Sequence, residues 1–113
     1  MSERVDIDAA LDEVAAGRTE AFGRVVRAYA LPLRGFLASQ VHHLDDVDDL
    51  AQEVFLAAYR NLHVFRRGEN LGAWLRGIAR HKLDNYFRSA ARRRGALGLF
   101  REQVAQIVAA DLD

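Results

Sequence analysis

Acidic and amide side chains line one side of a predicted helix in the middle of the chain. At about 100° per residue, Asp49, Gln52 and Glu53 lie opposite its apolar stripe, together with Leu56 and Arg60. An apolar side chain rimmed by hydrogen-bond acceptors suits the docking of a basic partner helix. A single exposed leucine is also ordinary at a protein surface, so the pattern alone leaves both interpretations open.

A basic and aromatic segment follows, from Phe65 to Arg94. Arginine side chains hold phosphates, and aromatic faces receive unstacked bases, so the composition indicates a nucleic-acid surface. The alternative is a solvated helix held by pairs of Asp84 with Arg80 and Arg88, with Trp74 in the core. On the predicted helix, the side away from the core carries Arg76, Arg80, His81 and Arg88. Phe87 lies beside Arg76 and Arg80, Trp74 lies on the flank, and Lys82 falls on the apolar side.

The sequence lacks the residue patterns of metal sites and of common catalytic sites. The acids at 45, 46, 48 and 49 have neither the glycine nor the alternating spacing of a calcium loop, and helix capping explains them. No HExxH pattern, glycine-framed serine or GxxxxGK loop occurs, and the chain has no cysteine. We therefore expect no enzymatic activity, no metal and no cofactor.

Charge is segregated along the 113 residues although the formal net charge is zero. Residues 1–53 hold 11 acids and 5 bases, whereas residues 54–113 hold 5 acids and 11 bases. One half suits a basic partner and the other a polyanion. Fifteen of the 16 bases are arginine, which a GC-rich genome could also produce, but genome composition does not explain their clustering.

The elements that position these groups are helices, because apolar residues recur at helical spacing and no segment alternates with period two. We predict an all-α fold: a compact bundle of about four helices plus a short amphipathic tail helix. The first helix ends near Gly17, and Thr19 caps a second that Pro32 kinks or divides. Asp45 or Asp46 caps a third that reaches about His63. A turn over 66–70 precedes a fourth helix over about 71–91, and Phe100, Val104, Ile107 and Val108 mark the tail.

Core positions follow from the same spacing. The third helix should bury Val47, Leu50, Ala51, Val54, Phe55, Ala58 and Leu62, and the fourth Leu71, Leu75, Ile78, Ala79 and Tyr86. The longest stretch without a charge is residues 35–44, too short to span a bilayer, and the start has no secretory pattern. We expect a cytoplasmic location.

The order of these motifs resembles region 2 of bacterial sigma factors, most of all the extracytoplasmic-function (ECF) class. The similarity covers about residues 8–94 and is carried by 49–55 (DLAQEVF), Phe65, 74–80 (WLRGIAR) and the arginine-rich helix end. It implies a helical bundle that docks on the clamp helices of the RNA polymerase β′ subunit. It also implies capture of the unwound non-template strand of the promoter minus-ten element.

Site residues are carried over by position. Asp49, Gln52 and Glu53 match the polymerase-contact signature, which makes Leu56 and Arg60 interface candidates. The loop from Phe65 to Leu71 matches the loop that receives a flipped promoter base. The predicted DNA-binding residues are Phe65, Arg66, Arg67, Asn70, Trp74, Arg76, Arg80, His81, Asn85, Arg88, Arg92, Arg93 and Arg94.

Two departures from the family pattern matter. His81 replaces the usual asparagine, which leaves the base preference open because histidine donates, accepts and stacks differently. The helix-turn-helix domain that reads the minus-thirty-five element has no counterpart. We expect residues 1–94 to form the region 2 domain and 95–113 to begin an interdomain linker; a natural single-domain protein with a packed tail is the alternative.

Two other functions compete with a promoter-binding role. One is a sigma-like interaction module held by an anti-sigma factor and inactive on DNA. The other is a helical protein that binds single strands without sequence preference and without polymerase.

Overall fold

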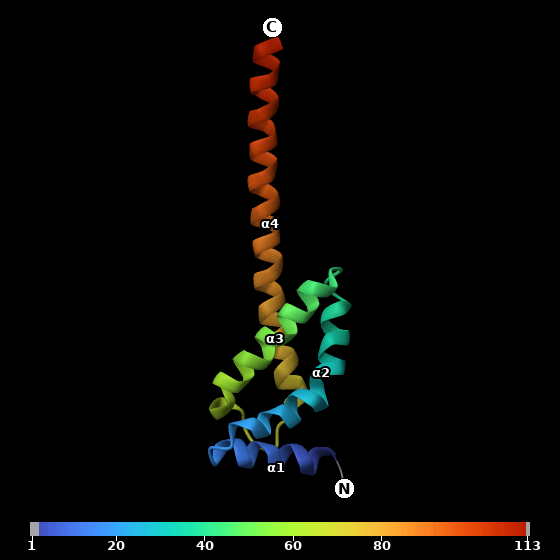
Figure 1. The fold of residues 1–113 in the computed structure, drawn as a ribbon, viewed down its shortest axis with the longest axis vertical. Helices are drawn as coiled ribbons and strands as arrows, with labels where there is room; N and C mark the ends of the chain where they lie inside the picture. The colour runs from blue at the N-terminus through green and yellow to red at the C-terminus, as the bar shows by residue number, and fades with distance from the viewer. Residues whose placement is uncertain (1–2, 113) are drawn as a thin grey trace. The chain divides into compact units, whose positions relative to one another are not determined.

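The described residues contain four α-helices, two short 3-10 turns and no strand. The computed structural model describes residues 3–112. The helices are α1 (Glu3–Ala15), α2 (Phe22–Ala38), α3 (Leu44–Arg60) and α4 (Leu71–Leu112), with 3-10 turns at Thr19–Ala21 and Leu62–Val64 (Figure 1). The predicted all-α class is confirmed.

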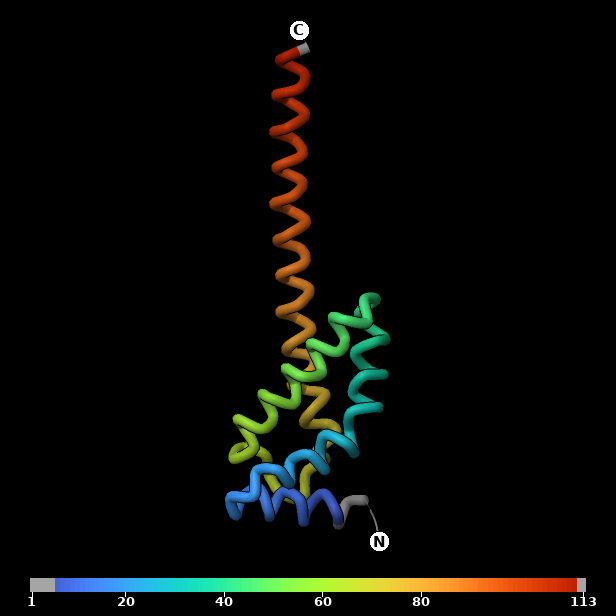
Figure 2. Tube along the Cα trace, viewed as in Figure 1, coloured from blue at the N-terminus to red at the C-terminus, as the bar shows by residue number. Residues whose placement is uncertain are grey.

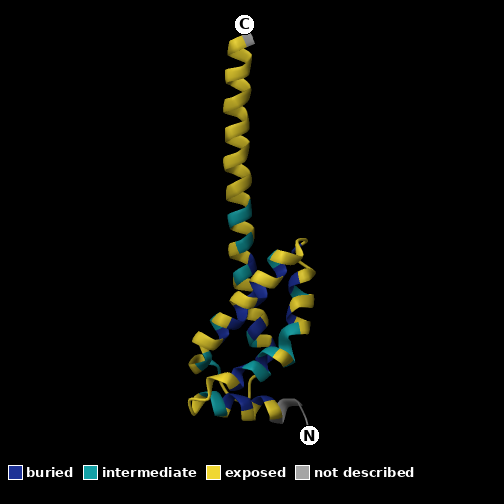
Figure 3. Cartoon of the chain, in the orientation of Figure 1, coloured by how far each residue is buried: buried dark blue, intermediate teal, exposed yellow. Residues whose placement is uncertain are grey.

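The chain divides between Lys82 and Leu83 into two units. The first contains α1, α2, α3 and the first three turns of α4. Its core includes five side chains that are at most 2% exposed: Val25, Leu37, Val47, Val54 and Leu75. Buried residues line the inward sides of these helices, and exposed ones cover their outward sides (Figure 3). The stripe predicted on α3 is buried as expected except for Leu62, which follows the helix and is half-buried.

Helix α2 continues through Pro32 as one helix. Its trace bends partway along (Figure 2), as expected where a proline removes a hydrogen bond from the helix interior. Pro32 is exposed, so its ring lies outside the core. The prediction of a kink is confirmed, and a division into two helices is not observed.

Two predicted helix caps are wrong. Thr19 is the first residue of a 3-10 turn and makes no side-chain cap. Helix α3 begins one residue before the acids, with His43 in extended conformation at the N-cap, so Asp45 and Asp46 occupy its first turn. There the positive end of the helix dipole still favours carboxylates.

The largest difference lies beyond residue 91. A break was expected at the arginines and Gly95, but α4 continues to Leu112. Glycine costs a helix about 1 kcal/mol relative to alanine without forbidding it, so Gly95 alone does not end one. The separate tail helix is therefore wrong, whereas the domain boundary at residue 94 stays a prediction. In the second unit, residues 91–111 are all exposed.

Among the described residues, no helix is both long enough and apolar enough to cross a membrane.

Candidate functional site

The outward face of α3 carries the first candidate surface. Asp49, Gln52, Glu53 and Arg60 are all exposed, and the Leu56 side chain is 53% exposed between them. The neighbouring Asp48 is already paired with Arg34 of α2, at 2.9 Å between Nε and Oδ1. The structure thus places the five residues predicted for polymerase contact on one accessible face.

The loop between α3 and α4 carries the second. Its backbone turns at Gly68, whose φ of 91° is a conformation that side-chain-bearing residues rarely adopt. Asn70 then caps α4: its Oδ1 accepts a hydrogen bond from the Ala73 N–H at 3.0 Å. The start of the DNA-candidate helix is therefore fixed by a residue of the loop itself.

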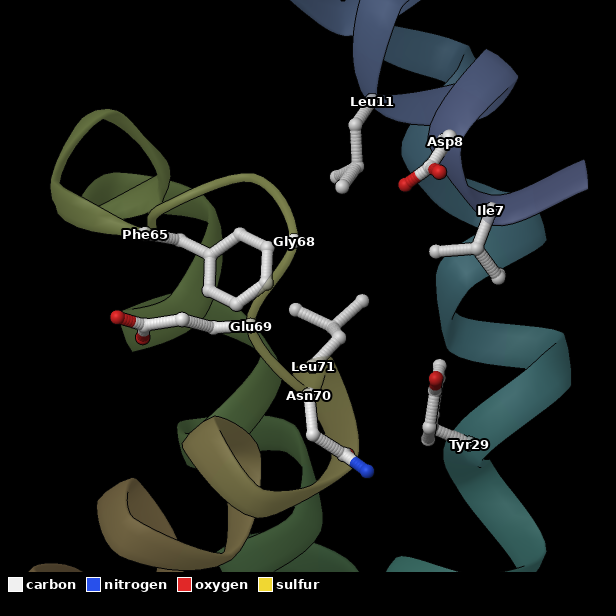
Figure 4. A pocket seen from close by; sticks show the side chains of 9 residues that line it. All are labelled: Ile7, Asp8, Leu11, Tyr29, Phe65, Gly68, Glu69, Asn70 and Leu71. Atoms are coloured by element: carbon white, nitrogen blue, oxygen red, sulfur yellow. The ribbon is translucent and has the colours of Figure 1, made fainter. Parts of the chain in front are cut away.

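A pocket of about 290 Å³ lies between this loop, α1 and α2 (Figure 4). Ile7, Asp8 and Leu11 of α1 and Tyr29 of α2 face Phe65 and the residues around Asn70 across it, and Gly68, Glu69 and Leu71 complete the lining. In Figure 4 the Asp8 carboxylate points from α1 toward the loop, the Asn70 amide nitrogen points toward the Tyr29 side of the pocket, and the Glu69 carboxylate lies away from α1. The pocket thus offers an aromatic face, an acceptor and a donor, which a nucleobase needs for stacking and edge recognition.

Contacts of two loop residues, Phe65 and Arg67, hold the loop in place. The Phe65 ring packs on Trp74, with centroids 5.2 Å apart and planes tilted by 45°. Arg67 pairs through Nη2 with Asp12 Oδ1 at 2.8 Å and donates through Nη1 to the Asp8 backbone oxygen at 3.4 Å. Arg67 would have to exchange Asp12 for a phosphate to contact DNA, and in this structure it ties the loop to α1.

The α4 residues of the first unit form a basic exposed side next to the loop. Arg76, Arg80 and His81 are exposed, and Trp74 is half-buried against Phe65. Arg80 lies over the Phe36 ring, 5.8 Å from its centroid, which restricts its guanidinium without burying it. Arg76 and Arg80, four residues apart, share one face of α4, whereas Trp74 and His81, seven residues apart, lie on another side of the helix.

Arg66, also predicted to bind DNA, is exposed in the loop. The predicted DNA residues from Asn85 onward belong to the second unit and are considered there alone. Asn85 accepts a hydrogen bond from Arg88 Nη2 at 3.2 Å, and Arg88 Nε donates to the Asp84 backbone oxygen at 3.5 Å. Arg92 Nη2 donates to Ser89 Oγ at 3.4 Å, and Arg93 and Arg94 are exposed.

Sequence reasoning missed the α1 and α2 walls of the pocket. Asp8 and Asp12 share a face of α1, one turn apart, which was a usable signal. Their partner Arg67 lies more than 50 residues away, so nothing local points to it. The described residues contain no cluster of acids and histidines that could hold a metal.

Residues 25–93 match the family model for Sigma-70 region 2. The chain belongs to the sigma-70 region 2 family. The match covers more than half of the chain and includes both candidate surfaces apart from the α1 wall of the pocket.

Curated relatives of this region 2 chain are sigma factors. It is 32% identical over 93 residues to the ECF RNA polymerase sigma-E factor of Haemophilus influenzae, covering 82% of this chain and 49% of that one. It is 45% identical over 60 residues to RNA polymerase sigma factor HrpL of Pseudomonas syringae pv. syringae, covering 53% and 33%. The chain therefore spans half or less of the length of these relatives.

A solved structure has the same fold. An engineered region 2 of sigmaE, determined by NMR in complex with GTAAAA, superposes with a TM-score of 0.70 at 29% identity, covering 82% of this chain and 93% of that one. The predicted resemblance to ECF region 2 is confirmed.

Proposed function

We propose that this chain is the promoter-recognition region of a bacterial ECF-type sigma factor. It binds core RNA polymerase through α3 and holds the unpaired non-template strand of the minus-ten element through the loop and α4. It acts by binding rather than by catalysis, in the cytoplasm. One observation carries the proposal: an exposed acid and amide face and a nucleobase-sized pocket beside arginines occur within one folded unit.

For the DNA face, unstacking a base costs a few kcal/mol, which contacts inside a pocket offset. The pocket of about 290 Å³ admits one base against Phe65, with Asp8 and Asn70 at its edges. Arg76 and Arg80 lie on the following helix, where they suit the phosphates on either side of that base. The similar engineered region 2 of sigmaE was solved in complex with GTAAAA, which supports this assignment.

For the protein face, Leu56 supplies an apolar anchor, and Asp49, Gln52 and Glu53 supply acceptors around it. Such a face fits a helix that carries arginines and lysines, as the family's β′ clamp helices imply. An anti-sigma factor would be a competing occupant of the same face.

The DNA face is tested with labelled GTAAAA and a scrambled oligonucleotide of the same composition. We expect the chain to bind GTAAAA more tightly than the scrambled oligonucleotide. The logarithm of the binding constant should fall with the logarithm of the salt concentration, with a slope of about −0.7 for each phosphate contacted. Arg80→Ala should weaken binding without unfolding the chain, and Arg27→Ala, an exposed arginine on α2, should not. Equal binding of both oligonucleotides would favour the nonspecific single-strand binder, and no binding would favour the interaction module; either result contradicts the proposal.

The protein face is tested by capture of core RNA polymerase. Gln52→Ala and Glu53→Lys should weaken capture and leave the melting temperature nearly unchanged, because both side chains are exposed. Glu20→Lys makes the same charge change at an exposed position off α3 and should not weaken capture. A large drop in melting temperature for Glu53→Lys would mean that this side chain is structural.

A further inference from the structure

The second unit carries an apolar stripe that the proposed function does not use. Along residues 97–108 of α4, the exposed fractions are 50% for Leu97, 61% for Phe100, 41% for Val104, 62% for Ile107 and 51% for Val108. At 100° per residue these five side chains fall within an arc of about 100°, the width of a helix face that packs on another helix.

The stripe has the spacing of a coiled-coil seam. Leu97, Phe100, Val104 and Ile107 are separated alternately by three and four residues, as the a and d positions of a heptad are. Continuing the same register places Arg93 one step before Leu97 and Asp111 one step after Ile107. The seam therefore has four apolar positions with a cation at one end and an anion at the other.

The opposite charges of Arg93 and Asp111 at the two ends of the seam favour a second copy of the same helix in antiparallel orientation as its partner. Two copies side by side in antiparallel orientation place Leu97 opposite Ile107 of the second copy and Phe100 opposite its Val104. The same register places Arg93 opposite Asp111 of the second copy, so that each end of the seam closes with an ion pair. In parallel orientation Arg93 would face Arg93 and Asp111 would face Asp111, and both like-charge pairs oppose association.

We infer that residues 93–111 of α4 form an antiparallel helix pair with a second copy of this chain. The inference is independent of the proposed function, since it uses only the second unit. It also explains why this part of α4 stays helical although all its sides are exposed and it contains Gly95 and Gly98. Each glycine costs about 1 kcal/mol in a helix interior, and pairing along the seam offsets that cost. Arg93 is then shared between pairing and its predicted DNA contact.

Sedimentation equilibrium over a range of concentrations tests the association. The wild-type chain should approach twice its 12.7 kDa mass as concentration rises. Val104→Asp should raise the dimer dissociation constant at least tenfold. Leu99→Asp is the matched control: Leu99 is 64% exposed, more than Val104, but lies off the seam, so it should have little effect. A monomer at every concentration, or equal effects of the two changes, would overturn the inference.

A charge exchange tests the pairing of the ends. Arg93→Asp and Asp111→Arg should each weaken the dimer, and the double variant should recover most of the loss because the ion pairs are restored with reversed polarity. Losses that simply add would contradict the Arg93–Asp111 pairing. Circular dichroism of each variant at high concentration separates lost pairing from lost helix.

Disulfide trapping tests the orientation, since the chain has no cysteine of its own. Gln103 and Ala110 flank the seam at equivalent heptad positions, and only Gln103 lies near the centre of the antiparallel pair. Gln103→Cys should therefore form disulfide-linked dimers quickly and Ala110→Cys slowly. Equal rates would indicate a parallel pair and overturn the inference.

Discussion

The α3 face and the loop pocket differ in how they are built. The α3 face comes from a single helix, and its exposed residues follow directly from the helical repeat. The pocket needs three segments, α1, α2 and the loop, and an ion pair between Arg67 and Asp12 ties the loop to α1. A surface on one helix is present whenever that helix is present, whereas a pocket between segments also depends on contacts distant in sequence. The two faces should therefore respond differently to the same size of perturbation.

The largest expected effect comes from the core that both faces share. Leu75 of α4 is 2% exposed in the packed interior. Leu75→Ala should lower the free energy of unfolding by about 2–5 kcal/mol through lost burial and a cavity. Urea unfolding measures this loss. Leu75→Met is the control, because it keeps the side-chain volume and should lower the free energy of unfolding by less than about 1.5 kcal/mol. Loss of oligonucleotide binding with intact polymerase capture would show that the two faces do not share one cooperative core.

The next effect should separate the faces completely. Leu56→Asp places a charge at the centre of the α3 face and should weaken capture of core polymerase at least tenfold, or about 1.4 kcal/mol. Oligonucleotide binding and stability should change little, because the Leu56 side chain is 53% exposed. Leu31→Asp is the control, since Leu31 is 77% exposed on α2. Similar losses in both variants would remove Leu56 from the interface.

A third change acts at the pocket and not at the α3 face. Asn70→Ala removes the cap of α4 and should cost about 1 kcal/mol of stability, together with oligonucleotide affinity. Asn61→Ala is the matched control: it removes a 2.8 Å bond from Asn61 Nδ2 to the Ala57 oxygen at the end of α3. Stability should fall in both variants, but oligonucleotide affinity only in the first. Equal affinity losses would mean that stability rather than pocket geometry sets binding.

The same contrast explains what the sequence could predict. The helical repeat was sufficient to place the α3 core stripe and the exposed Gln52, Glu53 and Leu56, because these depend on one helix. It also indicated the turn at Gly68. It could not indicate that α1 lines the pocket, since Asp12 and Arg67 meet only after the chain has folded. The continuation of α4 past Gly95 was not predicted, because a glycine favours a break locally, whereas the helix-forming residues on both sides of it continue the helix.

The smallest expected effect bears most directly on the difference between the faces. Arg67–Asp12 and Arg34–Asp48 are both exposed ion pairs, at 2.8 and 2.9 Å, so each contributes less than about 1 kcal/mol. Asp12→Asn and Asp48→Asn should therefore be nearly indistinguishable in urea unfolding. Hydrogen exchange should distinguish them: amides of residues 66–70 should exchange about two- to fivefold faster in Asp12→Asn and at the wild-type rate in Asp48→Asn. Because the loop has few other attachments to α1, a weak pair controls its local opening even though it contributes little to global stability. Unchanged exchange in Asp12→Asn would mean that the Phe65–Trp74 contact and the Asn70 cap hold the loop without α1, and the pocket would then be as local a feature as the α3 face.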